Sequence, residues 1–207
     1  MTVETAPLSL EQLVESTRGA QPWRKVFHGL NGVLVAAVLA FGLVPTDTAV
    51  TILVAVLGGL VVLDLIRLGN REANLLFFRV FGPLASPREA KGMASSTWYA
   101  LGILTALTLF PTPEAISGIL VLGLADPTAG YVGRRWGGRP FLGGTTVGTL
   151  VFVTVALLVL AMRHPWPAAL AAALFAALAE RLSWPLDDNF TVPLVCAGTL
   201  AAAGLFL

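Results

Sequence analysis

Seven apolar stretches of near-membrane length constrain the fold of this chain more than any other feature of its sequence. A helix needs about 20 apolar residues to cross roughly 30 Å of hydrocarbon, and in lipid a helix satisfies its own backbone hydrogen bonds. We therefore predict an all-α fold, a polytopic transmembrane helical bundle of about seven spans. The stretches cover residues 26–44, 48–66, 93–110, 115–133, 145–162, 166–182 and 190–207.

The composition agrees with a membrane protein and argues against a soluble globular domain. Of the 207 residues, 56% are hydrophobic and only 12% are charged, and the mean hydropathy is +0.81. The formal net charge of +1 gives no indication of nucleic-acid binding. Cys196 is the single cysteine, so we expect no intrachain disulfide. The first twenty residues contain three glutamates and no apolar core, so we expect no cleavable signal peptide.

The chain divides into a short leading segment and one large domain. Residues 1–22 are predicted to form a cytoplasmic amphipathic segment, and residues 23–207 a single transmembrane domain. Leu8 to Val14 are predicted to form a short helix at the membrane surface, with Ser9 as its N-cap and Gln12 three residues on. A second interfacial helix is predicted between the second and third spans, where charged residues alternate with leucine and phenylalanine.

Lysine and arginine predict how the bundle is oriented. If the N-terminus lies in the cytoplasm, twelve of the thirteen basic residues fall in cytoplasmic segments, and only Arg163 falls outside. Such an excess of positive charge marks the cytoplasmic side of membrane proteins. We therefore predict a cytoplasmic N-terminus, an external C-terminus and a functional site that faces the cytoplasm.

Asp126 is the polar residue with the clearest functional signal, because it lies inside the apolar stretch 115–133. A charge within a span costs about 2.5–3.5 kcal/mol on insertion scales, so its presence suggests a function. Glycines follow it, together with Arg134, Arg135 and Arg139. Glycine lets backbone N–H groups approach an anion, and the arginine fork suits phosphate oxygens. A divalent cation could bridge Asp126 to a phosphate, although an ordinary cytoplasmic loop has a similar composition.

Other polar residues fall on the same predicted side, each with a plainer alternative. His28 could orient or deprotonate a hydroxyl, or anchor the first span at headgroup level. Asp64 and Arg67, one helical turn apart, could form a local ion pair. Lys91 could bind phosphate or simply obey the positive-inside rule. An oxygen-rich cluster could hold a second metal or a substrate hydroxyl, or could cap a helix through Asp188 or Asn189. That cluster comprises Glu180, Asp187, Asp188 and Asn189.

Together these stretches resemble the polytopic family of CTP-dependent lipid-alcohol kinases, which includes dolichol kinase, phytol kinase and the yeast-type diacylglycerol kinase. The most specific piece is Ala125-Asp126-Pro127-Thr128-Ala129 with Gly133-Arg134, which is similar to the family core Gly-Asp-x-x-Ala-x-x-x-Gly-Arg. The resemblance runs from about residue 24 to residue 193. Its other pieces are Arg24-Lys25-Val26-Phe27-His28, Asp64-Leu65-Ile66-Arg67, Lys91-Gly92, and Glu180 with Asp188-Asn189-Phe190-Thr191-Val192-Pro193.

The resemblance implies an integral-membrane phosphotransferase that moves phosphate from CTP to the hydroxyl of an isoprenoid or other lipid alcohol, such as phytol or a polyprenol. It implies catalytic roles for Asp126, His28 and Asp188, with Mg²⁺ held by Asp126 and Asp188. The residues expected to bind nucleotide or phosphate are Lys91, Gly133, Arg134, Arg135, Arg139, Thr145 and Gly148. The supporting polar residues are Lys25, Asp64, Arg67, Glu180 and Asn189.

The chain departs from the family pattern just after the core. Where the family typically has Lys-Thr-x-Glu-Gly followed by Ser or Thr, this chain has Gly144-Thr145-Thr146-Val147-Gly148-Thr149. The replaced lysine and glutamate predict an altered activity or donor choice, unless Arg135, Arg139, Asp187 or Asp188 substitutes for them. Two alternatives stay open: a CTP:phosphatidate cytidylyltransferase that makes CDP-diacylglycerol, and a non-catalytic lipid-binding relative.

Overall fold

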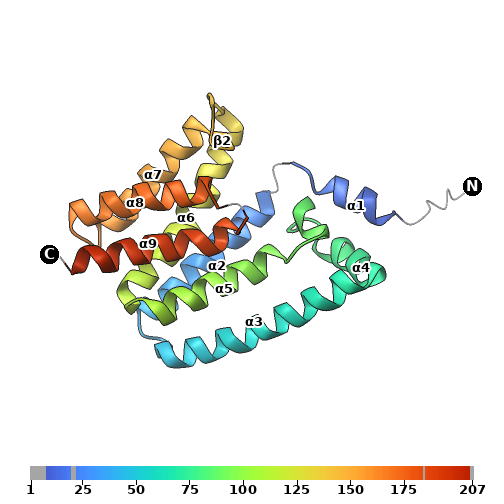
Figure 1. The fold of residues 1–207 in the computed structure, drawn as a ribbon, viewed down its shortest axis with the longest axis horizontal. Coiled ribbons are helices and arrows are strands. Elements are labelled where there is room, and N and C mark those ends of the chain that lie inside the picture. Colours follow the sequence, from blue (N-terminus) through green and yellow to red (C-terminus); the bar gives the residue numbers. More distant parts are fainter. Residues whose placement is uncertain (1–7, 20–21, 184, 206–207) are drawn as a thin grey trace, which may run out of the picture.

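The computed structural model describes residues 8–19, 22–183 and 185–205, most of which are helical. One short hairpin, of β1 (Pro140–Phe141) paired antiparallel with β2 (Gly144–Thr145), interrupts the helices. Figure 1 shows the long helices packed as one elongated bundle. The helices are α1 (Leu10–Ser16), α2 (Pro22–Ala40), α3 (Thr46–Gly69), α4 (Arg71–Phe81), the 3₁₀ helix η1 (Pro87–Ala90), α5 (Ser95–Leu109), α6 (Thr112–Trp136), α7 (Thr146–Ala161), α8 (Trp166–Arg181) and α9 (Asp188–Gly204).

Each of the seven predicted spans corresponds to one long helix, so the prediction of an all-α fold is confirmed. The helices in question are α2, α3 and α5 to α9, and their ends differ from the predicted ones by a few residues. Within the described residues, α3 and α6 are long and apolar enough to cross a membrane, and α7 is apolar but shorter. The number of spans and their orientation stay predictions.

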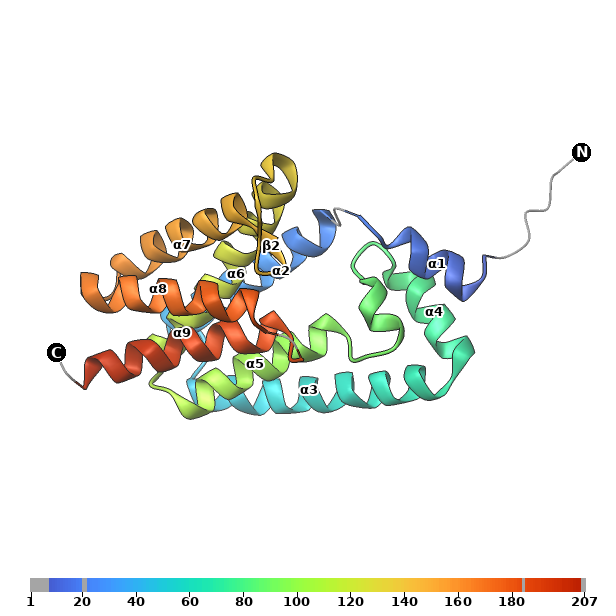
Figure 2. The same ribbon diagram turned by 45° about the horizontal axis from the view of Figure 1, so that its top comes forward.

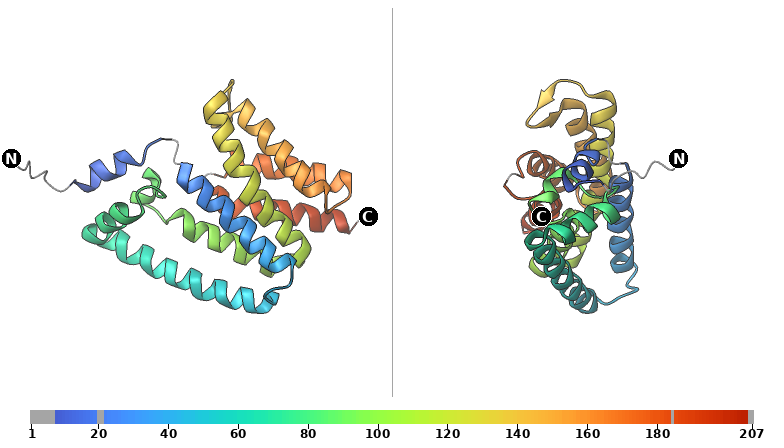
Figure 3. Two further views of the ribbon diagram at one scale, coloured as in Figure 1. Left: turned by 180° about the vertical axis from the view of Figure 1, so that it is seen from behind. Right: turned by 90° about the vertical axis from the view of Figure 1, so that its right-hand side faces the viewer.

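The helix that carries Asp126, α6, lies at the centre of the bundle and packs against α2, α5, α7 and α9. Figure 3 shows α2 and α6 side by side from behind. Small residues permit this close packing. A Cβ on Gly123 would lie 3.0 Å from the Cα of Gly32 in α2, and a Cβ on Gly133 would lie 3.1 Å from the Cα of Gly148 in α7.

Pro127 lies inside α6, one residue after Asp126. Proline has no N–H, so it cannot donate to the carbonyl four residues earlier, which belongs to Gly123. That carbonyl faces α2, where a Cβ on Gly29 would lie 3.0 Å from it. A glycine in α2 therefore lets the helices meet at the point where Pro127 interrupts the hydrogen bonding of α6.

In α3, charged residues are buried and apolar residues are exposed, which is the reverse of the distribution in a helix of a soluble protein. Of its 24 residues, only Asp64 and Arg67 are buried. Its apolar side chains face outward, as the exposed fractions of Leu63 (62%) and Leu65 (68%) illustrate. Figure 1 shows α3 along one edge of the bundle, next to α5. A long apolar outer face with charge inside is typical of a helix that faces lipid.

Asp64 and Arg67 form the predicted ion pair, but they also join distant parts of the chain. Arg67 Nε donates to Asp64 Oδ1 (2.6 Å), and its other nitrogens donate to the carbonyls of Glu89 (2.6 Å) and Gly92 (2.7 Å). Asp64 Oδ2 accepts from Thr97 Oγ1 (2.7 Å). The pair therefore fixes η1 and the start of α5 against the end of α3.

The leading helix α1 has the predicted cap. Ser9 N donates to Gln12 Oε1 (2.8 Å) and Gln12 N donates to Ser9 Oγ, which completes the capping box. The helix begins two residues later than predicted, at Leu10. It packs against α4, the helix found in the region predicted to be interfacial, and Arg71 and Glu11 form an exposed ion pair between the two (3.0 Å).

Candidate active site

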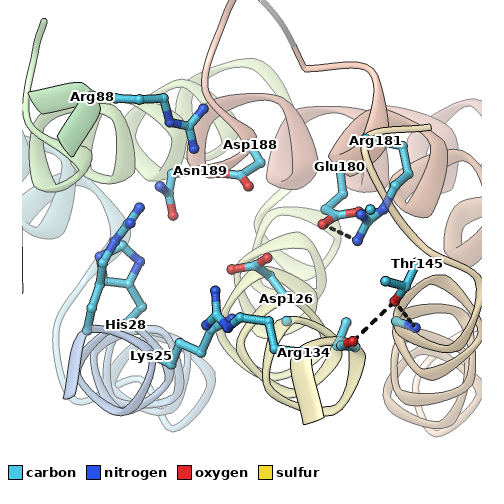
Figure 4. Close-up of a pocket in the computed structure, with 17 residues that line it drawn as sticks. Lys25, His28, Arg88, Asp126, Arg134, Thr145, Glu180, Arg181, Asp188 and Asn189 are labelled. Carbon is cyan, nitrogen blue, oxygen red and sulfur yellow. Dashed lines mark hydrogen bonds and ion pairs between the residues drawn. The ribbon is translucent and has the colours of Figure 1, made fainter. Parts of the chain in front are cut away.

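A polar cavity of about 480 Å³ lies at the end of the bundle where α6 ends and α7 and α9 begin. Figure 2 shows the β1–β2 hairpin at this end, between α6 and α7. Figure 4 shows the side chains that line the cavity, which come from α2, η1, α6, the hairpin, α7, α8 and α9. The antiparallel arrangement of the helices thus gathers polar residues that are up to 165 positions apart in sequence, from Arg24 to Asn189.

Three carboxylates from three helices converge in this cavity: Asp126 of α6, Glu180 of α8 and Asp188 of α9. One oxygen of each lies within 4.8 Å of the others, and Figure 4 shows the side chains pointing toward a shared space. Carboxylates so close repel one another when ionised, and a divalent cation between them removes that repulsion. The predicted metal ligands Asp126 and Asp188 therefore lie together, and Glu180, from the oxygen-rich cluster that could hold a second metal, joins them.

The start of α9 explains how Asp188 comes to face the cavity. Asp187 is the N-cap, and its Oδ1 accepts from the backbone N (3.1 Å) and the Nδ2 (2.6 Å) of Asn189. The cap is therefore neither Asp188 nor Asn189, the residues that the capping alternative proposed. Asn189 Oδ1 is buried without a hydrogen-bond partner among the described residues. Such an oxygen can accept from a ligand or coordinate a cation.

Five cationic side chains and three carboxylates line the cavity. This excess of positive charge favours a ligand with several negative charges. A bound divalent cation would increase the excess. The cations are Arg24, Lys25, Arg88, Arg134 and Arg181.

Glycines let two of these cations reach the cavity. A Cβ on Gly130, one turn after Asp126, would overlap the Lys25 ammonium. A Cβ on Gly144 in the hairpin would overlap the Arg181 guanidinium, which also donates to Glu180 Oε1 (2.6 Å). Arg181 therefore occupies the space next to position 144, where the family pattern has a lysine.

The start of α7 adds a backbone site for anions. Thr145 caps this helix, its Oγ1 accepting from Gly148 N (3.1 Å). Unpaired N–H groups in the first turn of a helix attract anions, phosphate in particular. Thr145 and Gly148 both line the cavity, so this end of α7 faces the same space as the cations.

His28 is held at the wall of the cavity by Tyr99 of α5. The two ring centroids are 5.1 Å apart, and the Tyr99 hydroxyl donates to the His28 carbonyl (3.1 Å). The imidazole is therefore positioned by packing from the neighbouring helix. It lines the cavity.

The structure brings most of the predicted site residues together, although their roles stay predictions. Lys91 is exposed at the end of η1, Arg135 lies over the Trp136 ring (5.8 Å), and Arg139 is exposed, so none of the three lines the cavity. Asp64 and Arg67 belong instead to the buried network at the end of α3. The predicted site residues that do line the cavity are Lys25, His28, Asp126, Gly133, Arg134, Thr145, Gly148, Glu180, Asp188 and Asn189.

Three cations of the cavity were not predicted as site residues: Arg24, Arg88 and Arg181. Arg24 belongs to the stretch from Arg24 to His28 that carries the resemblance, and Arg181 directly follows Glu180, so both had a signal in the sequence. Arg88 had none, because its place depends on how the Asp64–Arg67 network holds η1.

Comparison with known proteins adds to this geometry. A CTP-dependent diacylglycerol kinase from Schizosaccharomyces pombe is 26% identical over 190 residues, which cover 82% of this chain and 81% of that protein. The corresponding proteins of Saccharomyces cerevisiae and Eremothecium gossypii are 28% and 30% identical over 114 residues, or 55% of this chain. These two matches cover only 39% and 36% of the relatives.

The predicted resemblance to CTP-dependent lipid kinases is confirmed. No family model matches the chain, and no solved structure matches it. The relationship therefore rests on the curated relatives.

Proposed function

We propose that this protein is a CTP-dependent lipid-alcohol kinase, which transfers the terminal phosphate of CTP to the hydroxyl of a lipid. The observation that carries the proposal is the convergence of Asp126, Glu180 and Asp188 within 4.8 Å in a cavity lined by five cations. Such a site suits a metal–triphosphate complex. The names of the relatives support CTP as donor and a lipid as acceptor.

We infer that the chain is a multi-pass integral membrane protein with this site at the cytoplasmic face. Two observations support the inference. The outer face of α3 is apolar while its only buried residues are Asp64 and Arg67, and all but one of the thirteen basic residues fall on the predicted cytoplasmic side. A lipid hydroxyl at the membrane surface could then reach the end of the bundle.

The residues of the cavity divide into two groups with complementary tasks. Lys25, Arg134 and Arg181 would bind the phosphates, with the first turn of α7 as an additional anion site. Asp126, Glu180 and Asp188 would hold Mg²⁺, with the buried Asn189 oxygen nearby. When bound, Mg²⁺ neutralises charge on the triphosphate and so lowers the barrier to phosphoryl transfer.

In the proposed reaction, the lipid hydroxyl oxygen forms a bond to the γ-phosphorus of CTP, and the bond from that phosphorus to the bridging oxygen breaks. CDP leaves, and the phosphate stays on the lipid. His28 or Asp188 orients the hydroxyl and accepts its proton. The barrier is lowered mainly by positioning and charge neutralisation, which is the task of the cationic residues around the cavity.

The relatives and the sequence resemblance suggest two acceptor classes. The names of the relatives indicate diacylglycerol, and the wider family that the sequence resembles also contains kinases of isoprenoid alcohols such as phytol and polyprenols. A transfer assay with γ-labelled CTP, Mg²⁺ and a panel of these alcohols would identify the acceptor. We expect a labelled lipid with the parent protein and at least about a hundredfold less with Asp126→Asn.

The same assay separates the alternative functions. If α-labelled CTP and phosphatidate yielded a CDP-lipid, the protein would be a cytidylyltransferase. If neither label reached a lipid and CTP did not bind, the non-catalytic alternative would replace the kinase.

A further inference from the structure

A second cavity, of about 250 Å³, has mostly apolar walls. His28 lines both this cavity and the polar cavity described above, which we call the phosphate site. The walls of the second cavity come from α2, α3, α4, η1, the start of α5 and the short segments between α4 and α5. This cavity and the first differ in chemistry, since one is rich in cations and the other in hydrocarbon. The apolar lining residues are chiefly Phe27, Leu60, Leu63, Phe77, Phe81 and Leu84.

The charged residues that reach the second cavity are paired with other groups of the protein. Asp64 and Arg67 bind each other, with exposed side-chain fractions of 6% and 5%. Glu89 Oε1 accepts from Ser95 Oγ (2.8 Å) and from Ser86 N (3.2 Å). Because these charges are satisfied within the protein, the cavity suits an uncharged apolar molecule better than a phosphate or nucleotide.

Polar side chains lie where the two cavities meet. His28 lines both. Arg24, which lines the first, donates to Ser95 Oγ (2.9 Å), which belongs to the second. A molecule with a hydrocarbon chain in the second cavity would therefore meet the imidazole of His28 where the polar site begins. An imidazole can hydrogen-bond a hydroxyl as donor or as acceptor.

The second cavity also reaches the outer surface of the bundle. Leu63 of α3 is 62% exposed, and Phe27 of α2 and Phe81 of α4 are each 48% exposed. These side chains line the cavity and continue into the apolar outer face of α3. A hydrocarbon chain could therefore enter from the side that we infer to face lipid, without crossing the cationic site.

We propose that the second cavity binds the hydrocarbon next to the hydroxyl of the lipid acceptor, and that His28 marks the point where this hydroxyl enters the phosphate site. The proposal rests on the proposed kinase function and names its acceptor subsite. It specifies an uncharged lipid alcohol as the occupant. It assigns the apolar and cationic cavities to the acceptor and the donor, respectively.

Two variants of α3 provide a matched test. Leu63→Trp would narrow the second cavity, whereas Leu65→Trp changes a leucine of similar exposure (68%) that lines neither cavity. We expect Leu63→Trp to raise the KM for diacylglycerol at least tenfold and to leave the Kd for CTP within twofold. Leu65→Trp should change neither. Equal effects of the two variants, or a change in CTP affinity with Leu63→Trp alone, would overturn the proposal. If Leu63→Trp does not fold, Leu60→Phe tests the same wall.

A binding measurement keeps this inference separate from the kinase proposal. A diacylglycerol analogue with a diazirine in its acyl chain, irradiated with the parent protein without CTP, should label peptides of α3 and α4, and unlabelled diacylglycerol should compete. Such labelling without any phosphate transfer would remove the kinase function and retain the lipid-binding cavity. Phosphate transfer with labelling elsewhere in the chain would retain the kinase and overturn the cavity as its acceptor subsite.

Discussion

The two longest helices, α6 and α3, distribute polar and apolar residues in opposite ways. α6 buries small and apolar residues along most of its length and presents Asp126 and Arg134 to a cavity at one end. α3 buries only Asp64 and Arg67 and turns its apolar residues outward. The comparison teaches that charge near a helix end can serve two purposes in this protein. In α6 it forms the proposed site, and in α3 it holds the scaffold together.

The largest expected effect concerns stability and tests the scaffold assigned to α3. Arg67→Met leaves Asp64 as a buried charge without its ion-pair partner, which typically costs about 3–5 kcal/mol. We therefore expect a large drop in the melting temperature of the detergent-purified protein. Arg71→Met is the control, since the Arg71–Glu11 pair is about 70% exposed and such pairs contribute little. If Arg67→Met kept the melting temperature but lost CTP binding, Arg67 would belong to the CTP site and would not stabilise the fold.

The next effect concerns rate and tests the site assigned to α6. Asp126→Asn keeps the size of the side chain but removes its charge, so we expect phosphate transfer to fall by about 10²–10³-fold while the fold is retained. Glu180→Gln should act similarly if all three carboxylates hold the metal. Asp47→Asn, an exposed acid in the first turn of α3, serves as the matched control. Loss of the fold with Asp126→Asn would show that this carboxylate is structural, as Asp64 is.

A smaller effect is expected where Arg181 occupies the space beside Gly144. Arg181→Ala should raise the KM for CTP about tenfold, since a charged hydrogen bond contributes about 1.5–3 kcal/mol. Gly144→Lys alone should also impair the enzyme, because its side chain displaces Arg181. The double variant should recover much of the loss if a lysine at position 144 can replace the arginine.

Arg18→Ala, at an exposed arginine of the leading segment, controls for the removal of positive charge. If the double variant had a KM for CTP as high as that of the worse single variant, a lysine at position 144 could not replace Arg181. The arrangement of Arg181 would then be incidental to CTP binding.

The sequence predicted the long helices well because a long apolar stretch has few alternatives to a helix. It also indicated Asp126 and the group around Asp188, since polar residues in such a chain are few. It offered an ion pair for Asp64 and Arg67, but it did not predict that this pair also joins distant parts of the chain, because these two residues and Asp126 all lie at the same predicted side. Only tertiary contacts distinguish them: Arg67 donates to the carbonyls of Glu89 and Gly92, far along the chain.

It was harder to predict which arginines line the cavity. Sequence proximity to Asp126 suggested Arg135 and Arg139, yet successive helix positions differ in direction by about 100°, so Arg134 faces the cavity and Arg135 does not. Arg181 depends on the approach of α8 to the hairpin at Gly144. No pattern within either segment contains that information, because it arises from the packing of two helices onto a turn.

The mildest test concerns the far end of α6, where a buried serine contacts a histidine. Ser117 is fully buried, and His164 Nε2, from the loop after α7, lies 2.8 Å from its Oγ. Ser117 Oγ also donates to the carbonyl of Pro113 (2.9 Å). Burial lowers the pKa of His164, although Glu114 opposes the effect. The folded state therefore disfavours protonation of this imidazole relative to the unfolded state, where its pKa is about 6.5.

The sign of the pH effect follows from this difference. Above pH 6.5 both states hold a neutral His164, and as the pH falls through that value the unfolded state gains a proton first, which lowers stability. We expect the melting temperature to decrease by about 1–2 °C more in the parent than in His164→Gln between pH 7 and pH 5.5. An identical pH dependence in both proteins would show that His164 does not contribute, and that the Ser117 end of α6 is held by apolar packing alone.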